Sequence, residues 1–302
     1  MLPRIGPKVP GTGERDVIRW YQFQVLWLSP PHPLRLIDRM RSRLARLSKH
    51  LAHNHETKSN DSRHKEFKRG PLEPPMQLRH VGGIGDFGKF ALLRHLMKDR
   101  RVAVCCYLTG QNDETQDRER HFDYLKHPDD FRHLAPELFD QLAAFDGGRR
   151  RVADPLTELQ SSKILANAIF LRKEVPKRVS LRRLWADELV ASVRCANLVF
   201  LDPDYGIEGK RLTNKHVALA EIAALRLRDR ALIISNQQSG RKSEVKFLLD
   251  RMRSLGCDPV EIIRLSLLKS RLYVIADHDP EMSQLIETFV RKWGNRIKSY
   301  NT

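Results

Sequence analysis

The sequence is poor in the residues that mark disulfide-rich, zinc-binding and membrane-spanning proteins. Its 4 cysteines have no CxxC spacing, and its 12 histidines form no HExxH or HxxxH pair, so no zinc site is predicted. No apolar run approaches the roughly 18–20 residues of a membrane span, and Pro3, Pro7 and Pro10 interrupt any export-signal pattern. These absences exclude an integral membrane protein and predict a reduced, cytoplasmic chain.

Acidic residues are the minority among the charges. The 302 residues include 54 Lys and Arg against 37 Asp and Glu, which gives a net charge of +17. Such an excess favours polyanionic partners, and nucleic acid is the predicted one. Residues 1–75 carry 15 of the basic and 7 of the acidic residues, so the excess is densest there.

The chain divides by composition into an arm and a body. Residues 1–75 are basic and rich in proline and histidine, which predicts a largely disordered arm. Within it, apolar residues at steps of three and four predict one basic amphipathic helix at about 34–51. That helix fits a surface helix docked on the body, and it equally fits contact with nucleic acid or an anionic membrane. Residues 76–302 are predicted to form the folded domain.

The body alternates helical and extended patterns. An apolar run at Leu198–Leu201 suits a strand of a parallel sheet that is covered on both faces. The spacing predicts helices at 86–98, 120–125, 136–145, 180–194, 214–226, 243–255 and 280–293, and strands at 102–108, 197–202, 231–235, 260–267 and 272–276. We therefore predict an α/β fold with a three-layer, Rossmann-like, mainly parallel sheet, which ends in an antiparallel hairpin because the last link between strands is too short for a crossover.

A glycine-rich stretch, Gly82–Lys89, matches two phosphate-binding patterns in part. It contains GxGxxG and the first portion of GxxxxGK. Neither context is met, because no acidic residue closes the next strand and Phe90 stands where a magnesium-binding Ser or Thr is needed. Two interpretations remain. In the first, the glycines leave backbone N–H groups facing outward at the start of a helix that carries Asp86 and Lys89 in its first turns. In the second, the stretch is a tight turn with a helix cap, and Lys89 is a solvated charge.

A second motif follows the apolar strand, in the order Asp202-Pro203-Asp204-Tyr205-Gly206. Ligands of open α/β sheets bind beyond the carboxyl ends of strands, where such an acidic residue lies. Pro203 stiffens the strand exit, and Gly206 permits a sharp turn. A carboxylate, a rigid carbonyl and an aromatic face suit an amino-bearing base. Asp202, Asp204 and Glu208 also suit a divalent cation, and a plain turn with a capping aspartate is the third interpretation.

These two motifs together resemble those of the J-type ribosomal RNA adenine-N6 methyltransferases, which have the class I S-adenosylmethionine-dependent fold. Over 81–293 the chain is more similar to an uncharacterised bacterial family with GDFGK and LVFLDPDxGxE motifs. The methyltransferase resemblance implies that Asp202 and the Pro203 carbonyl accept the hydrogens of adenine N6 and that Tyr205 stacks on the base. Asp204 stands where those enzymes have a second proline.

The resemblance also implies a cofactor site for S-adenosylmethionine. The residues expected there are Gly82, Gly85, Asp86, Lys89, Asn112 and Asp113. The resulting expectation is a nucleic-acid adenine-N6 methyltransferase or a degenerate relative of one.

Two alternatives come from other classes of function. One is a metal-dependent nuclease or phosphohydrolase with a divalent cation on Asp113, Asp202, Asp204 and Glu208. The other is a nucleic-acid-binding protein without catalysis. The basic residues expected to contact nucleic acid are Arg172, Lys173, Lys177, Arg178, Arg182, Arg183, Arg241 and Lys242.

Overall fold

A computed structural model describes five stretches of the chain, 81–109, 121–145, 155–227, 229–237 and 240–300. The predicted arm at 1–75, with its helix at 34–51, and the candidate ligands Asn112 and Asp113 lie outside these stretches. Within them, no helix combines the length and the apolar character that crossing a membrane requires.

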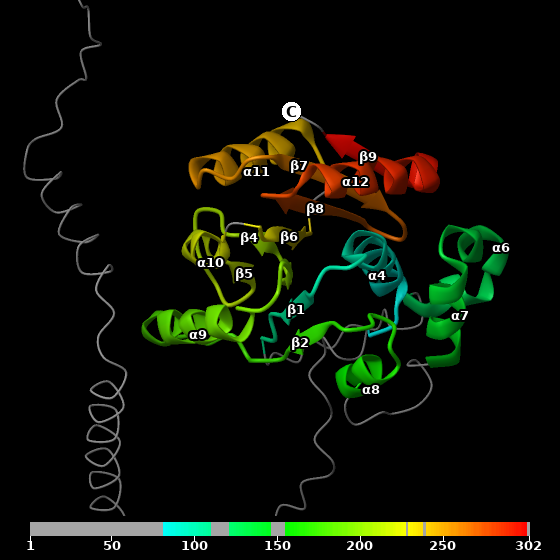
Figure 1. Ribbon diagram of the computed structural model, residues 1–302, viewed down its shortest axis with the longest axis horizontal. Coiled ribbons are helices and arrows are strands. Elements are labelled where there is room, and N and C mark those ends of the chain that lie inside the picture. The colour runs from blue at the N-terminus through cyan, green and yellow to red at the C-terminus, as the bar shows by residue number, and fades with distance from the viewer. Residues whose placement is uncertain (1–80, 110–120, 146–154, 228, 238–239, 301–302) are drawn as a thin grey trace, which may run out of the picture. The chain divides into compact units, whose positions relative to one another are not determined.

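The described body is an α/β structure built on a mostly parallel central sheet, compatible with a Rossmann-like fold (Figure 1). Its strand order is β2-β1-β3-β6-β8-β7-β9. β2, β1, β3 and β6 pair in parallel, and β8 pairs antiparallel to both β6 and β7. The bounds are β1 Val102–Cys106, β2 Ile169–Leu171, β3 Leu198–Asp202, β6 Ala231–Asn236, β7 Val260–Ser266, β8 Ser270–Ala276 and β9 Ile297–Tyr300. A separate parallel pair joins β4 Gly206–Ile207 to β5 His216–Val217.

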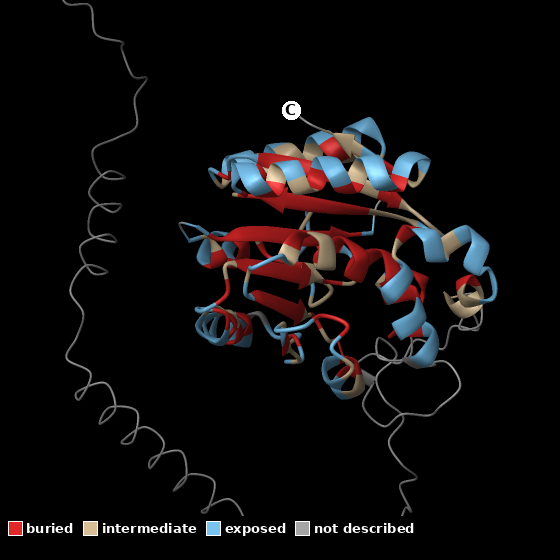
Figure 2. Ribbon diagram, turned by 45° about the vertical axis from the view of Figure 1, so that its right-hand side comes forward, coloured by how far each residue is buried: buried red, intermediate tan, exposed pale blue. Residues whose placement is uncertain are grey.

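Helices cover both faces of the sheet. One face carries α4 Ile84–Met97, α7 Pro136–Phe145, α8 Pro155–Ser161 and α12 Pro280–Trp293. The other carries α9 Val179–Ser192, α10 Leu219–Leu225 and α11 Lys242–Ser254. Three short helical segments, η1 Asp123–Lys126, α6 Pro128–Phe131 and η2 Arg132–Leu134, precede α7, and η3 Gly294–Arg296 follows α12. The central strands β1, β3 and β6 are almost wholly buried, whereas many residues on the outer sides of the helices are exposed (Figure 2).

Alternation along the strands divides the interior into two cores. In β3, Phe200 contributes to the core beneath α4, whereas Val199 and Leu201 contribute to the core beneath α9 to α11. Successive side chains of a strand point to opposite faces, so a strand covered on both sides must be apolar throughout. Coverage on both faces therefore explains why the apolar run Leu198–Leu201 is uninterrupted.

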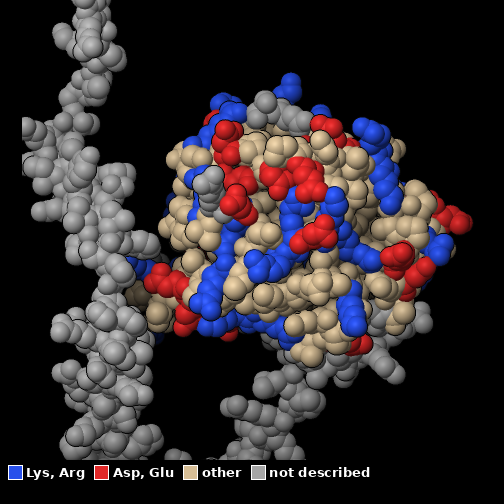
Figure 3. Space-filling view, viewed as in Figure 1, with Lys and Arg blue, Asp and Glu red and all other residues tan. Residues whose placement is uncertain are grey.

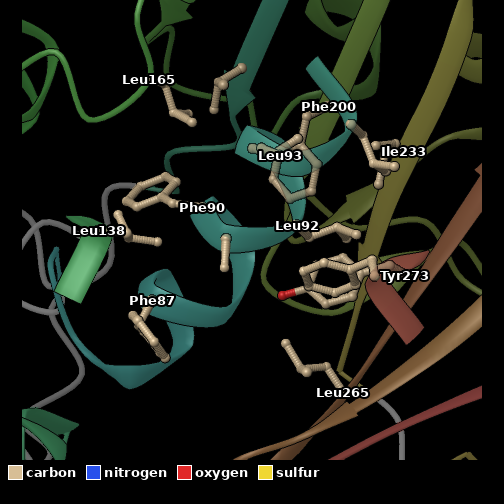
Figure 4. Packing of buried hydrophobic residues seen from close by; sticks show 14 of the residues in the cluster. Phe87, Phe90, Leu92, Leu93, Leu138, Leu165, Phe200, Ile233, Leu265 and Tyr273 are labelled. Atoms are coloured by element: carbon tan, nitrogen blue, oxygen red, sulfur yellow. The ribbon is translucent and has the colours of Figure 1, made fainter. Parts of the chain in front are cut away.

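Helix α4 is almost wholly enclosed. Phe87, Leu92 and Leu93 have essentially no exposed surface, and Figure 4 shows its side chains meeting Phe200 and Tyr273 of the sheet. Tight packing against the sheet holds the start of α4 in a defined position, because close-packed interiors resist displacement of one element past another.

Most predicted elements are present to within a few residues. The helix predicted at 214–226 is wrong in its first half, where residues 216–217 form β5 and the helix spans only Leu219–Leu225. In the segment predicted as a helix at 120–125, residues 121–122 are α-helical, and a short 3-10 helix, Asp123–Lys126, follows them. β2, β4, β9 and α8 were not predicted, because two to seven residues are too few for a periodicity to emerge.

Buried histidines predict a loss of stability in mild acid. His278 is 6% exposed, and burial lowers its pKa below the ordinary 6.5. The unfolded chain therefore binds a proton near pH 6.5 that the folded chain rejects, so the free energy of unfolding falls as the pH drops below that value. In wild type the free energy of unfolding, measured by urea denaturation, is expected to be higher at pH 7.5 than at pH 5.5. We expect this difference to be about 1 kcal/mol smaller in His278→Asn. An unchanged difference would show that His278 is not responsible.

Candidate functional site

The candidate site lies at the switch point of the sheet, where successive strands are added on opposite sides. From β1 the chain continues to β2 on one side, and from β3 it continues to β6 on the other. The carboxyl ends of β1 and β3 are adjacent, with Cys106 registered beside Asp202. Such a switch point is where open α/β sheets bind ligands. A cavity of about 870 Å³ opens at this point, between the end of β3 and the first turns of α4.

Lys89 joins the two sequence motifs. Its ammonium lies 2.7 Å from Oδ2 of Asp202 and 2.6 Å from Oδ1 of Asp86. The second oxygen of Asp86 accepts a hydrogen bond of 2.9 Å from the backbone N–H of Gly82. The glycine-rich stretch and the strand-end motif, 113 residues apart for Lys89 and Asp202, therefore form one site.

The charges of this cluster are stable near neutral pH. Burial alone would lower the pKa of Lys89, but the carboxylates of Asp202 and Asp86 outweigh it and raise that pKa far above its ordinary value. Burial would raise the pKa of Asp202, but the positive charges of Lys89 and Arg271 lower it below the usual range. Near neutral pH these directions make Lys89 an ammonium, which is not a base, and Asp202 a carboxylate, which is only a weak base.

Two further titratable groups beside the cluster, Cys106 and Tyr273, stay protonated near neutral pH. Burial and the charge of Asp202 raise the pKa of the Cys106 thiol to about 12. Burial also raises the pKa of Tyr273 to about 12. Nucleophilic catalysis by Cys106 is therefore disfavoured, because the thiolate is the reactive form.

The strand exit is held by backbone geometry. Gly206 has φ +112°, and a Cβ at this position would lie 2.0 Å from Oδ1 of Asn236. That same oxygen accepts a hydrogen bond of 2.8 Å from the N–H of Ile207. The prediction that glycine permits the sharp departure after Tyr205 is confirmed.

The predicted residues of the strand-end motif do not all face the cavity. Asp202, Pro203 and Asp204 line it, and Asp204 accepts a hydrogen bond of 3.3 Å from Thr109. Tyr205 is not among the described residues that line it. Its ring is 48% exposed and lies with its centroid 5.4 Å from that of the His216 ring, with the Lys215 ammonium 5.2 Å away.

Some of the predicted cofactor residues line the cavity and others do not. Gly85, Asp86 and Lys89 line the cavity, whereas Gly82 is buried beside it and acts through its backbone. A Cβ on Gly85 would meet no atom within 4 Å, so the structure does not require glycine there.

The cavity has an apolar end and a charged end. Beside β2 and α8 the lining is apolar, with Phe170, Leu156 and Leu159. Beside β3 and β8 it carries charged groups. These are Asp86, Lys89, Asp202, Asp204, Lys269 and Arg271. Ligand pockets combine such an apolar wall with a few convergent polar groups that orient the ligand.

Arg182 corrects the predicted nucleic-acid surface. It is 7% exposed, and its guanidinium pairs with Glu221 and donates a hydrogen bond of 2.7 Å to the carbonyl of His216. Glu221 also accepts hydrogen bonds of 3.1 Å from the Tyr107 hydroxyl and the Ala218 N–H. The interpretation of Arg182 as a nucleic-acid contact is wrong, because its side chain is buried and pairs with Glu221 in the interior.

The other predicted basic residues lie nearer the surface. Lys177, Arg178, Arg183 and Lys242 are exposed. Arg172 donates to Thr157 and Gln160, Lys173 pairs with Glu188, and Arg241 pairs with Glu244 at 3.5 Å. All of them follow the carboxyl ends of β2 or β6, at the edge where the cavity opens. On the face shown in Figure 3, positive and negative side chains are interspersed.

The side chains do not support the metal alternative. Among the described residues, no three His, Cys, Asp or Glu side chains gather as metal ligands do. Glu208 accepts a hydrogen bond of 3.0 Å from the N–H of Leu219, and Asp202 faces two cations. Asp113, the fourth proposed ligand, lies outside the described residues.

Sequence reasoning missed two partners of Asp202. Arg271 lies 3.8 Å from its Oδ1 and 3.3 Å from the hydroxyl of Ser235, and Ser235 hydrogen-bonds to Asp202. Both residues belong to strands that no motif marks. Their polarity at the carboxyl edge of an otherwise apolar sheet was the only available signal.

The fold and the site define an α/β protein with a cavity, lined by charged and apolar side chains, at the switch point of its parallel strands. No family model matches the chain, and no curated protein is detectably similar to it.

Proposed function

We propose that the protein is an S-adenosylmethionine-dependent adenine-N6 methyltransferase of nucleic acid, or a degenerate relative of one, with the class I methyltransferase variant of the fold. The observation that carries this proposal is the meeting of the two motifs, through Lys89 and Asp202, at one cavity. The antiparallel hairpin of β7 and β8, which lies beside the edge strand β9, supports it.

The cavity suits the cofactor in size and in chemistry. Its volume of about 870 Å³ falls within the range of small-molecule sites. The apolar wall formed by Phe170 and Leu159 suits a purine ring, and the carboxylates of Asp86 and Asp204 suit an amino group and a sulfonium. S-adenosylmethionine, when bound, supplies an electrophilic methyl group.

In this proposal the chain orients the substrate amine. The Asp202 carboxylate has capacity for further hydrogen bonds beside those of Lys89 and Ser235, so it accepts hydrogens of adenine N6 together with the Pro203 carbonyl. With S-adenosylmethionine bound, Asp202 and Pro203 would hold N6 toward its methyl group; transfer of that methyl group would release S-adenosylhomocysteine, and the surplus N6 proton would pass to solvent. Orientation is the chief contribution, since the lowered pKa of Asp202 makes its carboxylate only a weak base.

Calorimetry tests the cofactor site. Full-length protein titrated with S-adenosylmethionine is expected to release binding heat, and absence of binding at about 1 mM would overturn the proposal. Methyl transfer to adenine-containing RNA or DNA, measured as N6-methyladenosine by mass spectrometry, is expected to fall about 10- to 100-fold in Asp202→Ala, which removes a charged acceptor. Asp99→Ala is the matched control, because this exposed aspartate precedes β1 at the opposite edge of the sheet.

A further inference from the structure

The turn of the β7–β8 hairpin presents a leucine and a lysine at the cavity. Leu268 and Lys269 both line the cavity, yet both are exposed, with Leu268 at 41%. An exposed leucine is ordinary on a protein surface. One that borders the opening of a charged cavity has apolar surface available to whatever enters it.

The hairpin that carries this turn is firmly supported. β7 and β8 pair without interruption from Val260–Ala276 to Ser266–Ser270. A Cβ on Gly88 would lie 2.4 Å from Leu265 and 2.9 Å from Leu267, so α4 packs directly against the hairpin. The position of Leu268 is thus set by its neighbours on both sides.

The charge on this side of the cavity is positive. Lys269 follows Leu268, and Arg271 extends to within 3.8 Å of Asp202. Both line the cavity. An apolar side chain flanked by cations matches a nucleic-acid strand, because the cations meet phosphates and the apolar group meets base faces.

We propose that the Leu267–Lys269 turn is a wedge that holds the nucleic-acid substrate open. Leu268 occupies the place in the base stack that the target base leaves as it enters the cavity, and Lys269 contacts a flanking phosphate. The inference rests on the proposed function, since an enzyme that modifies a base must remove it from the stack.

The test uses short RNA and DNA duplexes that carry 2-aminopurine, a fluorescent adenine analogue whose emission rises on unstacking. Full-length protein is expected to raise this emission on at least one duplex. Leu268→Ala is expected to lose most of the rise, about fivefold or more, with less than about threefold change in affinity. Lys269→Glu is expected to weaken binding about tenfold and to reduce the salt dependence by about one phosphate contact.

The controls lie at the opposite edge of the sheet. Leu227 is 52% exposed and precedes β6, and Arg194 is exposed and precedes β3. Leu227→Ala and Arg194→Glu are expected to behave as wild type. Equal effects from the controls, no effect of Leu268→Ala, or no binding of either duplex would overturn the wedge. Calorimetry with S-adenosylmethionine on the same variants distinguishes failure of the wedge from failure of the cofactor site. If the wedge alone is wrong, the variants still bind S-adenosylmethionine; if the cofactor site is wrong, they do not.

Discussion

Replacing Arg182 with alanine is expected to lower the free energy of unfolding by about 3–5 kcal/mol, because it leaves a buried carboxylate without its cation. The side chains of Arg182 and Glu221 are 8% and 3% exposed. Arg182 also lies with its guanidinium 5.0 Å from the centroid of the Trp185 ring. Its removal thus costs an ion pair, a hydrogen bond to a carbonyl and a cation–π contact at once.

Urea denaturation of the variant and of wild type measures this loss. Arg183→Ala is the matched control, since Arg183 is the next residue of α9 and is exposed. It is expected to change stability by less than about 0.5 kcal/mol. Similar stability of the two variants would show that the pair with Glu221 contributes nothing net.

Lys89→Met is expected to produce the second large loss, about 3 kcal/mol or more at pH 7.5. The change leaves Asp86 and Asp202 in one site without their shared cation, and their side chains are 14% and 17% exposed. The same substitution is expected to weaken binding of S-adenosylmethionine, because Asp86 and Asp202 repel each other without Lys89 and change their positions at the cavity.

The pH dependence of the stability loss in Lys89→Met distinguishes loss of the ion pairs from loss of packing. In wild type the pKa of Asp202 is lowered, so its stabilisation is present above the ordinary value of 3.8 and is lost as the pH falls through the folded pKa. Without Lys89 burial raises that pKa, so the variant loses stability as the pH rises above the ordinary value. The deficit measured by urea denaturation is therefore expected to be smaller at pH 4.5 than at pH 7.5.

Lys98→Met is the control for this series, because Lys98 pairs with Glu281 at the surface. Exposed pairs contribute little, so only a small change in the free energy of unfolding is expected at either pH. A deficit of Lys89→Met that is equal at both pH values would point to packing alone.

Much of the fold followed from periodicity. The helix at Pro280–Trp293 begins at a proline that is acceptable in a first turn, after Asp279, which accepts a hydrogen bond of 2.7 Å from the N–H of Met282. Local signals of this kind act over three or four residues. β9 and β2 have none, since each is stabilised by pairing with a strand far away in the chain.

The candidate site was predicted in its parts and not in its arrangement. Asp86, Lys89 and Asp202 stood out because of their neighbours in sequence, and the structure places all three at one cavity. Tyr205 stood out equally, but its ring packs beside His216 outside the lining. The pattern of residues after a strand does not specify which way the chain turns.

By itself the sequence determined that the body is an α/β structure, that Leu198–Leu201 is covered on both faces and that two motifs lie at helix and strand ends. Those properties depend on local spacing and on the alternation of side chains along a strand. Only the tertiary structure decided that Arg182 is interior, that Arg271 faces Asp202 and that Leu268 borders the cavity. Each of these depends on which distant segments the sheet order brings together, and charge or hydropathy at one position does not encode its partner.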